Sequence, residues 1–109
     1  MAEITIHGQD RAREHCGIPK KAVGKVVEKA LVHGLTHQDT AGSLNRYMTS
    51  LYFYNKTANN VRLYSGKVFI FNNDRLITIF DIPAKYRDMV VKMLKKKESE
   101  FMSREVVII

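Results

Sequence analysis

The stretch VRLYSGKVFIFNNDRLITIFD, residues 61–81, decides the fold. It contains three short runs rich in β-branched and aromatic residues, at 61–64, 67–71 and 75–81. The dipeptide Ser65-Gly66 separates the first two runs and residues 72–74, all Asn or Asp, separate the last two, and such residues are typical of tight hairpin turns. The stretch therefore predicts an antiparallel β-meander of three strands.

The alternation of side chains within this meander predicts two different faces. The first strand alternates aliphatic side chains with Arg62 and Tyr64, and the second alternates them with Phe69 and Phe71. Because successive side chains of a strand point to opposite faces, each strand contributes to both faces of the sheet. We expect one face to pack against helices and the other to be partly aromatic and basic.

Helical spacing dominates the chain before the meander. Residues 7–16 predict a first helix that ends at Gly17, and residues 19–33 predict a second, with Pro19 in its first turn and Gly34 stopping it. The first helix carries a stripe of small residues that allows close packing against a neighbour: Gly8, Ala12 and Cys16.

Further helices are expected on either side of the meander. A third helix begins near Ser43 and ends at residues 52–54, where the aromatic residues could also begin a strand. A last helix follows Pro83. The apolar end, residues 106–109, is expected to add a strand at a sheet edge, either of its own subunit or of a second copy.

Length and composition place all this in one domain. With 109 residues and 45% hydrophobic content, the chain is expected to form a single α+β domain, 1–109, with N-terminal helices packed on the antiparallel meander and a C-terminal helix. Eighteen Lys and Arg against eleven Asp and Glu give a formal charge of +7, which favours a polyanionic partner.

The cysteine content and the hydropathy of the sequence indicate in which cellular compartment the protein is expected. Cys16 is the single cysteine, so no disulfide can form within the chain, and we interpret it as a core residue rather than a nucleophile. The sequence shows neither an apolar signal core near its start nor a run long enough for a membrane helix. We expect a cytoplasmic protein that does not associate with membranes.

The first predicted helix holds the best catalytic candidates. His7, Arg11 and His15 follow one another at intervals of four residues, so they form one stripe on a helix. A histidine can transfer protons near neutral pH and an arginine fork fits a phosphate, which together are requirements of RNA cleavage by transphosphorylation. The competing interpretation is a solvated helix face that happens to include two histidines.

Other residues predict binding rather than catalysis. On adjacent strands, cations alternate with aromatic rings in a pattern that allows bases to stack while phosphates are neutralised: Arg62, Tyr64, Lys67 and Phe69. Lys21, Lys25 and Lys29 line one face of the second helix, either as a solvated face or along a phosphate backbone. His33 and His37 stand four apart but Gly34 lies between them, so we expect no metal and no cofactor.

The pattern resembles a group of small toxin-like and prophage-borne domains, the barnase, EndoU, colicin and RelE group, or BECR fold. The resemblance covers roughly residues 4–82 and rests on these features: Ile6-His7, Arg11, Arg13 and Gly17, the helix up to Gly34, and Thr78 within Leu-Ile-Thr-Ile-Phe. In that group a first-helix histidine or arginine and a late-strand threonine often belong to an RNA-cleaving site. The resemblance thereby implies that His7, Arg11 and Thr78 are catalytic here.

Two functions remain open at this point. The first is an RNA-binding domain, for which Arg13, His15, Lys21 and Lys25 join the sheet residues as contacts, and whose ability to cleave RNA without a metal is undecided. The second follows from a similarity to short prophage proteins: a non-enzymatic counter-defence protein of the anti-CRISPR type, with a bacterial defence nuclease or nucleoprotein as its partner. No lysine or histidine lies on the strand of Thr78, which leaves a catalytically silent member of the group credible.

Overall fold

The computed structural model describes residues 3–14, 16–54 and 57–108, with side chains as far as Glu100. The predicted α+β class, with helices before the sheet and a helix after it, is confirmed. In chain order the elements are β1 (Glu3–Ile4), α1 (Ile6–Glu14), α2 (Lys20–His33), the 3-10 helix η1 (His37–Asp39), α3 (Gly42–Tyr54), β2 (Asn60–Tyr64), β3 (Lys67–Asn72), β4 (Arg75–Asp81) and α4 (Ala84–Ile108).

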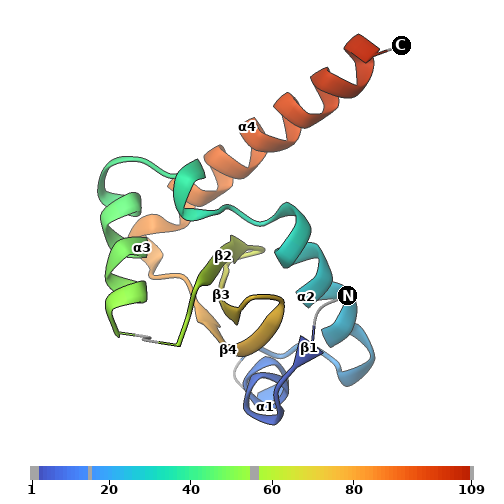
Figure 1. The fold of residues 1–109 in the computed structure, drawn as a ribbon, viewed down its shortest axis with the longest axis vertical. Coiled ribbons are helices and arrows are strands. Elements are labelled where there is room, and N and C mark those ends of the chain that lie inside the picture. The colour runs from blue at the N-terminus through green and yellow to red at the C-terminus, as the bar shows by residue number, and fades with distance from the viewer. Residues whose placement is uncertain (1–2, 15, 55–56, 109) are drawn as a thin grey trace.

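The sheet has the strand order β1-β4-β3-β2 (Figure 1). Strands β2, β3 and β4 form the predicted antiparallel meander. The sequence did not predict β1, which pairs in parallel with β4 and places Glu3 opposite Arg75 and Ile4 opposite Leu76. The sheet is therefore mixed rather than purely antiparallel. The sequence could not predict β1 because a strand of two residues is too short to show a periodic pattern.

The two hairpin turns form where their residues predicted them. Ser65 and Gly66 both have positive φ angles, 50° and 77°, which suits the right-handed twist of the strands that they join. Asn73 has a φ of 57° in the second turn, a conformation that asparagine tolerates better than most residues.

The small-residue stripe of α1 brings that helix close to the sheet, as expected. Gly8 and Ala12 are buried. A Cβ atom on Gly8 would lie 3.0 Å from the carbonyl oxygen of Leu76, so a larger side chain at this position would push α1 away from β4. Cys16 is half-buried and packs against the same cluster, so it lies at the margin of the core rather than inside it.

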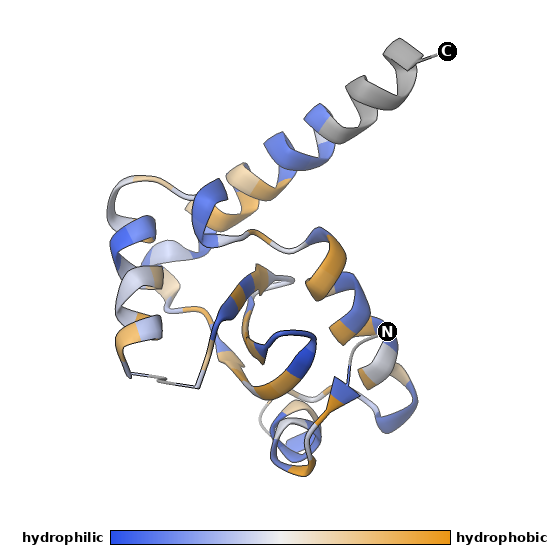
Figure 2. Cartoon of the chain, in the orientation of Figure 1, coloured by the Kyte–Doolittle hydropathy of each residue, from blue (hydrophilic) through white to orange (hydrophobic). Residues whose placement is uncertain are grey.

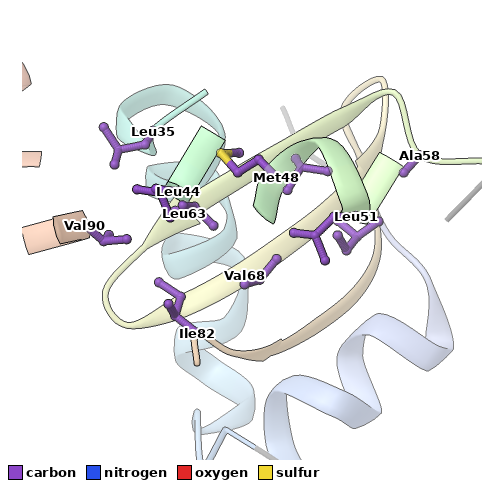
Figure 3. Packing of buried hydrophobic residues seen from close by; sticks show 11 residues of the cluster. Leu35, Leu44, Met48, Leu51, Ala58, Leu63, Val68, Ile82 and Val90 are labelled. Atoms are coloured by element: carbon purple, nitrogen blue, oxygen red, sulfur yellow. The ribbon is translucent and has the colours of Figure 1, made fainter. Parts of the chain in front are cut away.

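Helices cover both faces of the sheet. On one face, α1 and α2 pack on Phe69, Phe71, Leu76 and Ile79. On the other face, α3 and α4 pack on a second set of buried side chains, which includes Ile70 and, as Figure 3 shows, Leu63 and Val68. The expectation that helices pack on one face only is wrong: the face that carries Arg62, Tyr64 and Phe69 is covered by α1 and α2, because its phenylalanine side chains also need burial.

The tail does not form the expected strand. Residues 106–108 continue helix α4, which projects beyond the rest of the molecule in Figure 1, and residue 109 lies outside the described residues. One edge of the sheet is already closed to an added strand: Leu35 exchanges two backbone hydrogen bonds with Leu63, of 2.9 and 3.1 Å. The hydroxyl of Tyr52 accepts a further one from Val61 N at 2.9 Å.

We expect substitution of the glycine within α2 and of the glycine at its C-cap to change the stability of the protein in opposite directions. Gly24 lies inside the helix with open space around it, so Gly24→Ala should raise the free energy of unfolding by about 0.5 to 1 kcal/mol. A Cβ atom on Gly34 would lie 2.4 Å from the carbonyl oxygen of Ala30, so Gly34→Ala should lower that free energy by about 1 to 3 kcal/mol.

Thermal melts of both variants beside the wild type measure these changes. A Gly34→Ala variant as stable as the wild type would contradict the close approach of α2 to its C-cap.

Candidate nucleic-acid interface

The outward side of α2 carries a row of exposed cations, which we call the lysine face: Lys21, Lys25 and Lys29. The helix buries Val23, Val27 and Ala30 against the sheet, so the residues on the other side of the helix point to solvent. Figure 2 shows hydrophilic and hydrophobic residues alternating along α2. At a rise of about 1.5 Å per residue, neighbouring lysines of this face are about 6 Å apart along the helix axis.

Few carboxylates offset the charge of α2. The helix contains four lysines, Lys20 among them, and a single acidic residue, Glu28, which is half-buried. The two ion pairs among the described residues, Lys67–Asp81 and Lys97–Asp39, involve none of the four. The lysines of α4 differ, because Asp88, Glu98 and Glu100 are exposed on the same helix.

The candidate catalytic residues are only partly brought together. His7 is exposed on α1, and the half-buried Arg11 directs its Nε toward His7 Nε2 at 3.4 Å. Thr78 is half-buried on β4 opposite Ile70, and directly paired side chains share a face of the sheet. Because Ile70 belongs to the cluster under α3 and α4, Thr78 faces away from the side on which α1 packs. His15 lies outside the described residues.

The residues predicted to form a binding face on the sheet lie under helices or engage neighbours. Phe69 is fully buried, so base stacking on its ring is excluded in this structure, and Tyr64 is half-buried against the same cluster. Lys67 forms an ion pair with Asp81, and hydrogen bonding to Lys67 lowers the pKa of that carboxyl. Arg62 is half-buried, and its Nε donates to Asn60 Oδ1 at 2.8 Å.

A cavity lies where α1 leads into α2. It has a volume of about 380 Å³ and is lined by the last turns of α1, the connection 17–19 and Lys20. Arg13, predicted as a nucleic-acid contact, is exposed here, but Asp10 and Glu14 also line the cavity. The two carboxylates offset the two cations, so the cavity itself does not favour anions.

A polar network that sequence analysis missed ties α4 to the body of the protein. Lys97 Nζ donates to Gly34 O at 2.9 Å and to Asp39 Oδ2 at 2.8 Å. The carboxylate of Asp39 also accepts from Thr36 N, closing a capping box on η1. Burial raises the pKa of Asp39, but hydrogen bonds from Lys97 and Thr36 outweigh this and leave that pKa below its usual value. The spacing Thr36 to Asp39 signals the box, whereas nothing in the sequence signals its partner 58 residues further along.

Metal ligands and known relatives give no further guide to function. Within the described ranges, no three His, Cys, Asp or Glu side chains lie close enough together to hold a metal ion. Over the same part of the chain, no helix is long and apolar enough to cross a membrane. Comparison with protein families, with curated proteins and with solved structures finds no match for this chain.

The ion pair between Asp39 and Lys97 predicts a pH-dependent stability. Because folding lowers the pKa of Asp39, its contribution is present above the unfolded pKa of about 3.9 and is lost as the pH falls further. Asp39→Asn keeps an acceptor for Thr36 but loses the charge. We expect it to destabilise the protein at pH 7 by less than about 1 kcal/mol, since the pair is one-third exposed, and to match the wild type in acid.

Chemical denaturation at pH 7 and at pH 3 measures this difference. In a Lys97→Met background the effect of Asp39→Asn at pH 7 should shrink, as a double-mutant cycle requires for a direct interaction. A difference between wild type and Asp39→Asn that is the same at both pH values would exclude the charge as its cause.

Proposed function

We propose that this protein binds RNA through the phosphate backbone, with the lysine face of α2 as the principal contact. The single observation that carries the proposal is the row formed by Lys21, Lys25 and Lys29, exposed on successive turns with one half-buried carboxylate on the same helix. Lysine ammonium groups attract phosphates as point charges, and each contact releases counterions from the nucleic acid.

The position of the charges on α2 supports a role in binding. Lys20 and Lys21 occupy its first turn, and no acidic residue is present there. The helix dipole is positive at this end. An acidic residue here would stabilise the helix by about 0.3 to 1 kcal/mol, and a cation destabilises it instead. Local choices that oppose stability are expected at functional surfaces. The dipole also adds to the positive potential that a phosphate would meet.

The arrangement of the candidate catalytic residues His7, Arg11 and Thr78 supports RNA binding without cleavage by these three residues. A transphosphorylation site needs its proton-transfer groups within hydrogen-bonding reach of one phosphate. His7 and Arg11 are close to each other, but Thr78 belongs to the face of the sheet that α3 and α4 cover. The proposal therefore gives His7 and Arg11 no catalytic step with Thr78.

Salt dependence and charge reversal test the binding surface. The wild type should bind a fluorescent RNA at low salt and lose affinity steeply as salt rises. The triple variant Lys21→Glu, Lys25→Glu, Lys29→Glu should bind at least about tenfold more weakly and reduce the slope of log K against log salt by about 2 for a single strand.

A control variant with the same change of net charge separates a local site from a general effect. The triple variant Lys92→Glu, Lys95→Glu, Lys96→Glu alters exposed residues of α4 and should weaken binding less. Equal losses in the two variants, measured by fluorescence anisotropy, would reject α2 as the principal contact.

The absence of turnover is a separate expectation. In EDTA, total RNA and tRNA incubated with the wild type should stay intact on a denaturing gel, and His7→Ala should bind RNA as the wild type does. Products with 2′,3′-cyclic phosphate ends, formed by the wild type and about 100-fold more slowly by His7→Ala, would show that the protein is a ribonuclease.

A further inference from the structure

Few aromatic rings that could hold an unpaired base lie near the lysine face in the part of the chain whose side chains the structure describes. Phe69 and Phe71 are fully buried beneath α1 and α2, where their ring centroids lie 6.4 Å apart. The two most exposed aromatic side chains up to Glu100 are Phe53 and Tyr54, at the end of α3, and α3 packs on the opposite face of the sheet from α2 (Figure 1). A strand lying along the lysine face would therefore meet three lysines and a single ring, the imidazole of His33, which is exposed four residues beyond Lys29.

The lysine face also lacks the side chains that distinguish bases most selectively. Recognition of a base edge in a nucleic acid is mostly by forked or amide side chains, such as Arg, Asn or Gln, which make paired hydrogen bonds. Between Lys20 and His33 the exposed residues are Lys, Gly24, Val32 and His33. Lysine donates as a point charge to a phosphate without fixing the identity of the base.

Charge density then ranks the possible ligands. Proteins that prefer single strands obtain much of their affinity from stacking, which is worth about 1 to 3 kcal/mol per base. With no more than one ring on that face, counterion release dominates, and it gives the plot of log K against log salt a slope of about −0.9 per neutralised phosphate for a B-form duplex against about −0.7 for a single strand. Three lysines on one helix would thus gain more from a duplex, whose phosphates are more densely spaced.

We propose that the ligand of the lysine face is double-helical nucleic acid, bound through its backbone and without regard to sequence. This inference rests on the proposed function, since it names the form of nucleic acid that the same surface binds. The shared chemistry is the paired phosphate backbone, which RNA and DNA duplexes both supply.

Competition among matched probes tests the inference. The probes are an RNA duplex of about 16 base pairs, each of its separate strands, a DNA duplex of the same sequence, and a second RNA duplex of different base composition. At one low salt concentration, the full-length protein should bind the RNA duplex several-fold more tightly than either strand. The two RNA duplexes should agree within about twofold, because phosphate contacts carry no sequence information.

Variants of the protein show which surface is responsible for the preference for a duplex over its single strands. Lys21→Glu, Lys25→Glu, Lys29→Glu should abolish the preference for the duplex, and replacing the same lysines with Gln should leave an intermediate preference. Thermal melts confirm that both variants fold. The control triple variant on α4 should keep the preference. Equal binding of RNA and DNA duplexes supports a backbone contact, and tighter RNA binding supports recognition of its A-form shape.

The contrary outcomes are distinct. Tighter binding of the single strands, or a strong dependence on base composition, would overturn the inference while leaving RNA binding by α2 in place. Binding to none of the probes at low salt would overturn the proposed function, and the inference with it.

Discussion

The burial of β3 on both sides is the constraint on which the rest of the structure depends. Val68, Phe69, Ile70 and Phe71 follow one another with at most 1% of each residue exposed. Because alternate side chains point to opposite faces, a fully buried strand requires a layer of helices on each face. The chain meets this requirement by placing α1 and α2 before the meander on one face, and α3 and α4 on the other.

Local patterns were enough to predict most elements but not their assembly. The periodicity of α2 and the turn at Ser65-Gly66 depend on neighbouring residues, so both could be read from the sequence. Strand β1 could not, because its existence depends on a parallel pairing between Ile4 and Leu76, 72 residues apart. The assignment of helices to faces is equally non-local, and it decided that Phe69 is part of a core.

The candidate catalytic site shows how a small irregularity changes which residues share a face. In β4 both Leu76 and Ile79 lie under α1 and α2, although they are three positions apart and strict alternation would put them on opposite faces. A register shift between Ile70 and Phe71 accounts for this. Thr78 consequently pairs with Ile70 and lies on the face that α3 and α4 cover. A strand pattern predicts alternation, but it does not show where a bulge interrupts it.

Because helices cover both faces of the sheet, we expect a polyanion to contact the outer sides of the helices rather than the sheet. Once helices occupy both faces, the strands offer a ligand little beyond their ends, and the edge at β2 is already hydrogen-bonded to Leu35 and Tyr52. The charge of +7 must then be carried largely by helix exteriors. Of these, α2 packs on the sheet through three buried side chains and has one carboxylate, half-buried, among four lysines. Because a helix orders its backbone before any ligand arrives, a row of cations on α2 would lose little further backbone entropy on meeting a phosphate backbone.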